Sequence, residues 1–100
     1  MKVTNMTNSR GRKVANQFVI ENGNMYTFQS YNSVIAVVDF DNSIITLGYD
    51  WNYGTTTSRD RNKFFSTLGL DELSDTASVR EAIKAGEVAG YKVVYEEGLK

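Results

Sequence analysis

Residues 50–65 contain the largest group of side chains suited to chemistry or binding. Before this segment the apolar residues alternate as in strands, and after it they recur at helical spacing. This segment, the junction, holds Trp51 and Tyr53, three consecutive threonines and two arginines. Aromatic and arginine side chains dominate the centres of protein-binding surfaces. The junction also leads into a predicted helix, whose first backbone N–H groups have no partner inside the helix. We therefore expect a binding site at the junction.

Amide and aromatic side chains on the preceding strands could extend this site. The candidate binding residues are Asn16, Gln17, Tyr31, Tyr49, Trp51, Tyr53, Thr55, Thr56, Arg59, Arg61 and Asn62. Together they could contact a protein loop or a planar ligand. The alternative is structural: Trp51 and Tyr53 would close one end of the core, and the polar groups would satisfy a bent backbone.

Enzymatic chemistry has few candidate residues here. The chain has no cysteine and no histidine, which excludes thiol nucleophiles, imidazole catalysis and zinc sites built from nitrogen or sulfur ligands. Asp39, Asp41, Asp50 and Asp60 could act as acid and base or hold Mg²⁺, but their spacing pairs no two of them. Residues 39–50 favour a hairpin over a calcium loop, since Ile44 stands where such loops need glycine. We expect no enzymatic activity, no cofactor and no metal.

The net charge of −1 gives no overall attraction for nucleic acid or for a membrane. Basic residues are nevertheless concentrated near the N-terminus and in the junction. The candidate nucleic-acid contacts are Arg10, Arg12, Lys13 and Lys63, joined by Arg59 and Arg61 if the N-terminal segment lies beside the junction. Tyr26, Phe28, Tyr31 and Trp51 would then be stacking surfaces on a sheet. No recognised nucleic-acid-binding motif is present.

Length and composition predict one domain. One hundred residues, 41% of them hydrophobic, suffice for a single core. The longest apolar run, 34–38, is far too short to span a bilayer, and the N-terminus lacks the apolar segment of a secretory signal. We expect a single α+β domain over residues 1–100, partly irregular over 1–12, in the cytoplasm and away from membranes.

Alternating apolar residues predict four strands before the junction, at about 13–20, 25–31, 34–40 and 43–49. Turns at Asn22-Gly23, at 31–33 and at Asp41-Asn42 join them into an antiparallel meander. A strand at 13–20 or 91–96 on the edge of the sheet would allow a homodimer.

After the junction the apolar spacing becomes helical. The capping-box pair Thr57 and Asp60 predicts a first helix that ends before Gly69. The box at 78–81 predicts a second helix, whose start stays open back to Ser74. Residues 90–96 predict a last strand. The expected fold is α+β: a four-stranded antiparallel meander, two short helices and a C-terminal strand, with the helices packed on one sheet face.

Three ordered segments, at 8–18, 28–36 and 51–64, carry a family resemblance. They contain Asn8-Ser9-Arg10-Gly11, Phe28-Gln29-Ser30-Tyr31 and Trp51-Asn52-Tyr53. Over about residues 3–66 the chain resembles short, functionally uncharacterised proteins of phages and prophages of Gram-positive bacteria. The resemblance implies a genomic setting and no chemical activity. Relatives are expected to carry a polar residue such as serine where this chain has Gly54, which leaves the loop shape open.

The resemblance and the polar, aromatic junction lead to one expected function. We expect a small phage-type accessory protein in the host cytoplasm that binds a host or phage macromolecule stoichiometrically, for counter-defence or host takeover. Two alternatives stay open. One is single-stranded nucleic-acid binding, and the other is a nucleotide-like metabolite held by Trp51, Tyr53 and the helix N-terminus.

Overall fold

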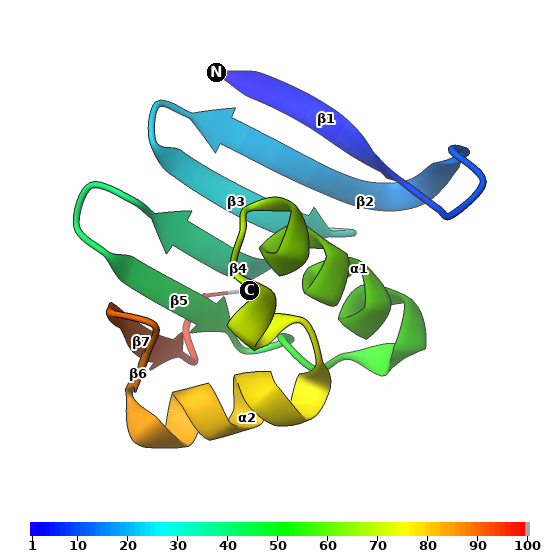
Figure 1. Ribbon diagram of the computed structural model, residues 1–100. Helices are drawn as coiled ribbons and strands as arrows, with labels where there is room; N and C mark the ends of the chain where they lie inside the picture. The colour runs from blue at the N-terminus through cyan, green and yellow to red at the C-terminus, as the bar shows by residue number, and fades with distance from the viewer. Residues whose placement is uncertain (100) are drawn as a thin grey trace.

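The protein consists of a mostly antiparallel sheet and two α-helices (Figure 1). Its structure is a computed structural model that describes residues 1–99. Within these residues the sheet has seven strands in the order β1-β2-β3-β4-β5-β7-β6. The strands are β1 (Lys2–Thr7), β2 (Lys13–Asn22), β3 (Met25–Ser30), β4 (Ser33–Asp39), β5 (Ile44–Gly48), β6 (Glu87–Val88) and β7 (Tyr91–Glu96). The predicted α+β class is confirmed, and the sheet is larger than expected.

The predicted meander corresponds to β2, β3, β4 and β5, which pair antiparallel in sequence order. The first turn lies one residue later than predicted: Asn22 is still in β2, and Gly23 takes the positive φ of 62°. After the helices, β7 joins the sheet parallel to β5, and the short β6 pairs with β7. Residues of β5 and β7, which are far apart in the sequence, are therefore neighbours in the sheet.

The N-terminal segment, expected to be partly irregular, forms the six-residue strand β1. Its pairing with β2 shifts register between Asn5 and Thr7. The Asn5 amide Nδ2 bridges this irregularity by donating to the carbonyls of Met6 and Val14, each at 2.8 Å. A polar edge strand has little apolar alternation, so the sequence pattern missed it.

Neither of the strands expected at an edge is at one. β2 lies between β1 and β3, and β7 lies between β5 and β6. The expectation was wrong because β1 and β6 add a further strand at each side. Pairing through an edge would therefore use β1 or the two-residue β6.

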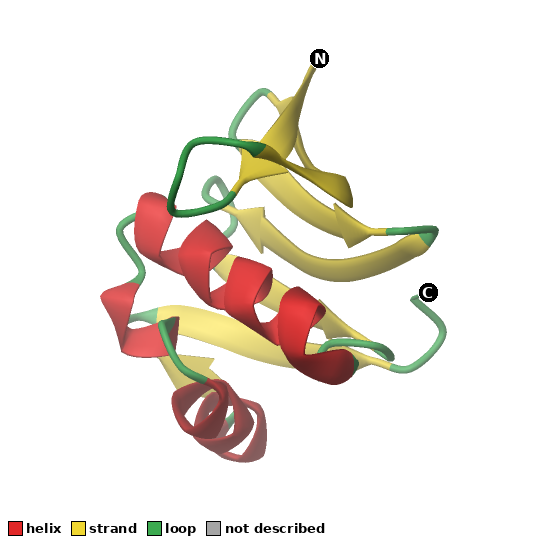
Figure 2. Ribbon diagram, turned by 90° about the vertical axis from the view of Figure 1, so that its right-hand side faces the viewer, coloured by secondary structure: helices red, strands yellow, loops and turns green. Residues whose placement is uncertain are grey.

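The helices are α1 (Gly54–Thr67) and α2 (Thr76–Ala85), with a 3₁₀ turn, η1 (Asp71–Leu73), between them. The α1 helix contacts β2 and β3, and α2 contacts β6 and β7. Figure 2 shows α1 lying along the sheet with α2 on the same side. Helices on one sheet face are confirmed. Within residues 1–99 no helix is long and apolar enough to cross a membrane.

The start of α1 differs from the prediction. The helix begins at Gly54 with Tyr53 as its N-cap, and no side chain caps it. Thr57 and Asp60 are buried, at 3% and 1% exposure, so the capping box is not formed. Its residue types matched the pattern, but both side chains face the sheet. In α2 the Asp75 side chain caps the Ser78 N–H at 2.8 Å, which is the earlier of the two starts considered.

One hydrophobic core joins the sheet to both helices. Phe28 of β3 stacks on Phe64 of α1 with ring centroids 5.8 Å apart, and Val79 of α2 belongs to the same buried cluster. Phe28 is 0% exposed because α1 covers this face of the sheet. The expectation that Phe28 offers a stacking surface was therefore wrong.

Candidate functional site

The junction divides its side chains between the interior and the surface. The junction begins with two successive turns. In these turns the Trp51 N–H donates to the Gly48 carbonyl and the Tyr53 N–H donates to the Asp50 carbonyl, both at 3.1 Å. Trp51 is half-buried against the core, whereas Tyr53 is 69% exposed. The two aromatic side chains have different roles.

Arg61 is the centre of the interior part. It is 0% exposed, and its guanidinium donates to the Trp51 carbonyl at 2.6 Å, to Asn62 Oδ1 at 2.8 Å and to Thr76 Oγ1 at 2.7 Å. Its Cζ lies 5.3 Å from the centre of the Trp51 ring, and Arg80 Cζ lies 5.6 Å from the same ring. No carboxylate in the described residues lies within ion-pair distance of Arg61. Burial, then repulsion from Arg80, lowers the Arg61 pKa to about 10.

These contacts fasten the junction to the first residue of α2. Arg61 and Asn62 bond within the protein, and Trp51 stacks on the guanidinium. For Trp51, Arg61 and Asn62 the structure therefore agrees with the structural alternative, in which the aromatic ring packs on the core and the polar groups bond within the protein. Arg61 can influence a ligand only through the residues above it, since its own side chain does not reach the surface.

The surface part of the junction forms a cavity of about 500 Å³, which we call the tyrosine groove. It is lined by Ser30, Tyr31, Asn32, Ser33, Ile35, Asp50, Tyr53 and Thr57. The rings of Tyr31 and Tyr53 are 59% and 69% exposed. They come from the β3–β4 turn and from the N-cap of α1, so the fold brings together two candidate residues that are far apart in sequence.

Tyr31 adopts an unfavourable backbone conformation. Its φ of 54° is in the left-handed region, which a residue with a bulky side chain rarely adopts. The Tyr31 N–H donates to the Asn16 carbonyl at 2.7 Å, and Asn16 itself has a φ of 63° within β2. Strain of this kind persists where surrounding contacts enforce it, and it clusters at functional sites.

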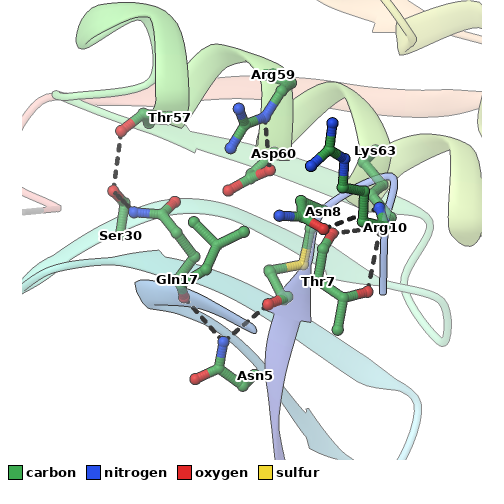
Figure 3. A network of polar contacts seen from close by, with 12 residues as sticks. Asn5, Thr7, Asn8, Arg10, Gln17, Ser30, Thr57, Arg59, Asp60 and Lys63 are labelled. Atoms are coloured by element: carbon green, nitrogen blue, oxygen red, sulfur yellow. Dashed lines mark hydrogen bonds and ion pairs between the residues drawn. The ribbon is translucent and has the colours of Figure 1, made fainter. Parts of the chain in front are cut away.

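A chain of buried polar groups forms the floor of the groove (Figure 3). Gln17 Nε2 donates to Ser30 Oγ at 2.8 Å, and Ser30 Oγ lies 2.9 Å from Thr57 Oγ1. Gln17 is 0% exposed, which places this candidate binding residue beneath the surface. These bonds tie α1 to β2 and to Ser30, the residue before Tyr31.

Two buried oxygens beside this chain, Gln17 Oε1 and Asp60 Oδ2, accept no hydrogen bond from the described residues. Figure 3 shows the Asp60 carboxylate between α1 and the Gln17 amide. Turning the amide by 180° would offer an N–H on the Asp60 side and an oxygen to the Ser30 hydroxyl. With the amide in that orientation, Gln17 would link the Asp60 carboxylate to the Ser30 and Thr57 hydroxyls.

The N-terminal hairpin does lie beside α1, which was the condition for a basic surface. Lys63 Nζ donates to the carbonyl of Thr7 and lies 3.3 Å from its hydroxyl. The Arg10 N–H donates to Asn8 Oδ1 at 2.9 Å in the turn that follows β1. Arg12 and Lys13 are exposed in the same turn and at the start of β2. Arg59, with its side chain 56% exposed, lies 3.3 Å from the buried Asp60 carboxylate.

The remaining candidates are at the surface in other positions. Thr55 and Thr56 are exposed in the first turn of α1, and Asn16 is exposed in β2. Tyr49 is 50% exposed, and its N–H donates to the Leu99 carbonyl at 2.9 Å. The structure brings Tyr31 and Tyr53 into one cavity but does not bring all candidate residues into it.

Trp51 lines a separate cavity of about 250 Å³ with Arg80, Ile83, Lys84 and Tyr95. Tyr53 lines the tyrosine groove and Trp51 lines this second cavity. The pocket for a nucleotide-like ligand stays a prediction. At the β4–β5 turn the Asp39 carboxylate accepts from the Asn42 side chain at 2.8 Å, which lowers the Asp39 pKa. In residues 1–99 no group of three or more acidic side chains could hold a metal ion.

Residues 1–84 match the model of a family of unknown function, DUF8033. The chain belongs to this family. The match runs from β1 almost to the end of α2, so it includes the tyrosine groove and the Arg61 contacts and leaves out β6 and β7. No curated protein matches this member of DUF8033, and no solved structure does. The phage setting suggested by residues 3–66 stays a prediction.

Sequence reasoning missed several residues that line the groove in this DUF8033 member. Ser30, Asn32 and Ser33 line the groove beside Tyr31, and Asp50 was considered only for catalysis or metal binding. The Ser33 hydroxyl donates to Asp50 Oδ2 at 2.8 Å and so links the β3–β4 turn to the junction. The signal was weak: short polar residues at a predicted turn usually serve only the turn itself.

Proposed function

We propose that this DUF8033 protein works by stoichiometric binding to another protein, of host or phage origin, through the tyrosine groove. The observation that carries the proposal is the pair of exposed tyrosines, 59% and 69% accessible, that line one cavity of about 500 Å³. Tyrosine is enriched at interfaces because its ring supplies contact area while its hydroxyl group forms hydrogen bonds.

The groove is held in shape before any partner arrives. Tyr31 is fixed by its bond to the Asn16 carbonyl, and the floor is fixed by the bonds among Gln17, Ser30 and Thr57. A surface that is already ordered loses less conformational entropy on binding. This preorganisation favours a surface that binds as a rigid unit.

The proposed setting is the cytoplasm of a host cell, with counter-defence or host takeover as the outcome of binding. It rests on the resemblance to short phage proteins over residues 3–66, a range that lies within the family match. In this account the protein would occupy its partner's surface and would not turn over a substrate.

Affinity capture from host lysate, followed by calorimetry with the purified partner, tests the proposal. The parent protein should bind one partner in a 1:1 ratio. The double variant Tyr31→Ala/Tyr53→Ala should lose that binding and keep its fold, because both rings are largely exposed. Tyr95→Ala is the matched control, since Tyr95 is 42% exposed and lines a different cavity. Equal binding by the double variant and the parent would refute the role of the groove.

Single-stranded nucleic acid is a second candidate, favoured by the contact that brings Lys63 beside the N-terminal turn. Arg10, Arg12 and Lys13 are exposed and follow Thr7 closely in the sequence, and Thr7 is the residue that Lys63 contacts. Four phosphate contacts would give log K a slope of about −3 against log salt concentration. Lys63→Ala should reduce this slope by roughly one contact's share. Absence of binding to single-stranded DNA and RNA at low salt would eliminate this candidate.

A further inference from the structure

From the charge of its lining, we infer that the tyrosine groove receives a lysine or arginine side chain of the bound protein. This inference rests on the proposed function and specifies the chemistry of the same site. Asp50 is the one charged residue among those that line the groove. The other lining groups are hydroxyls, an amide, one isoleucine and two tyrosine rings, none of which opposes a positive charge.

The Asp50 carboxylate is held in place. The Ser33 hydroxyl donates to Asp50 Oδ2 at 2.8 Å. The backbone of Asp50 is fixed as well, because the Tyr53 N–H donates to the Asp50 carbonyl at 3.1 Å. A carboxylate positioned by a neighbouring hydroxyl group pairs well with an ammonium or guanidinium group, since charge-assisted hydrogen bonds are short and strong. The groove therefore offers one fixed negative group at its side.

The two rings add a second preference for a cation. Tyr31 and Tyr53 are exposed on separate segments that line one cavity, and aromatic faces attract cations within about 6 Å of the ring. A volume of about 500 Å³ accommodates a lysine or arginine side chain. The hydroxyls of Ser30 and Thr57 at the floor could accept further N–H groups.

An anionic occupant is the opposing possibility, because the uncapped N-terminus of α1 lies beside the groove. A helix N-terminus carries only about half a positive charge, however, and the Asp50 side chain supplies a full negative one. The arginine and lysine residues on α1 do not line the groove either: Arg59 and Lys63 line a different cavity, beside Thr7. The balance of charge at the groove favours a cation.

NMR titration of the ¹⁵N-labelled protein with N-acetyl-L-arginine amide tests this inference. The matched probe is N-acetyl-L-citrulline amide, which has nearly the same shape and no charge. Arginine amide should shift the amide signals of Tyr31, Ser33 and Tyr53, with a millimolar dissociation constant, as expected for one side chain. Citrulline amide should bind roughly tenfold more weakly. Equal shifts from both compounds, or no shifts from either, would overturn the inference.

Two variants separate charge from shape. Asp50→Asn keeps an oxygen that can accept from Ser33, and it should reduce the affinity for arginine amide to that for citrulline amide. Asp41→Asn, an exposed carboxylate in the β4–β5 turn, should leave the affinity unchanged. An Asp50→Asn protein that binds arginine amide as the parent does would contradict the inference.

Partner binding distinguishes this failure from failure of the proposed function. If Tyr31→Ala/Tyr53→Ala loses the partner while Asp50→Asn binds it with unchanged affinity, the groove is the binding surface and the cationic occupant is wrong. If the double tyrosine variant keeps the partner, the proposed function itself is wrong, whatever the arginine titration shows.

Discussion

Replacing Arg61 should show how much the buried guanidinium contributes to stability. The side chain is 0% exposed, makes three hydrogen bonds and lies against Trp51, yet no described carboxylate pairs with it. Arg61→Ala would remove the donors and leave a cavity, whereas Arg61→Met would remove the charge and keep most of the volume. Comparison of the two variants separates the hydrogen bonds from the packing.

The magnitudes follow from opposing effects. Each hydrogen bond to the charged group contributes about 1.5–3 kcal/mol. Against this, the lowering of the Arg61 pKa to about 10 corresponds to a cost of about 3 kcal/mol for holding the charge inside. We expect Arg61→Met to lower the free energy of unfolding by about 2 kcal/mol and Arg61→Ala by about 4 kcal/mol, the difference being the cavity.

The same pKa gives a pH dependence with a definite sign. The unfolded chain holds the Arg61 proton up to the ordinary, higher pKa of arginine, whereas the folded protein, with its pKa lowered to about 10, releases it earlier. The unfolded state therefore binds more protons between these values, and this group's contribution to stability becomes less unfavourable as pH rises through that range. Arg61→Met should lack this component.

Urea unfolding provides the assay, and the single tryptophan, Trp51, provides a local fluorescence signal. With a slope of about 1.5 kcal/mol per molar urea, the midpoint should fall by roughly 1 M for Arg61→Met and by roughly 2–3 M for Arg61→Ala. Far-UV circular dichroism should give the same midpoints. An Arg61→Ala protein with the parent's midpoint would refute the structural role assigned to this residue.

Three further predictions concern positions outside this cluster. Gly48→Ala should lower the free energy of unfolding, measured by urea, by about 2–3 kcal/mol, because the added Cβ would clash with the backbone carbonyl oxygens of Val34 and Leu99. An unchanged free energy of unfolding would show that the segments around Val34 and Leu99 can move away from Gly48 at little cost. Thr57→Val should cost about 1–2 kcal/mol by the same assay, because it removes a buried hydroxyl that contacts Ser30, and additivity with Ser30→Ala would contradict direct coupling. Tyr31→Asn should raise stability by about 0.5–1 kcal/mol, since asparagine tolerates the left-handed backbone better, while it weakens partner binding; lower thermal stability would argue against strain at Tyr31.

Hydrophobic alternation predicted β2 to β5 because these strands carry regular apolar residues and end at polar turns. The same signal failed for β1, where Thr4 and Asn5 interrupt it. Pairing of β7 with β5 depends on the path of the whole chain and has no local signature. Local patterns therefore predicted the centre of the sheet and missed its margins.

The prediction made for the residues of α1 was wrong for a clear physical reason. Its buried residues are Thr57, Asp60, Arg61, Phe64 and Phe65, which follow the helical spacing of a core-facing stripe. Because the first three are polar, they were interpreted as a cap and a surface cluster. Their partners are in β3, in the junction and at the start of α2, and no local pattern indicates such contacts.

Site-specific photocrosslinking in host cells tests the central claim most directly. A benzophenone side chain would replace Tyr31 or Tyr53 in the tyrosine groove, and Met25, which is 41% exposed at the opposite end of β3, would serve as the control position. One crosslinked 1:1 complex with the same partner is expected from both groove positions, and none is expected from position 25. Products from position 25 alone, or from none of the three positions, would contradict the central claim.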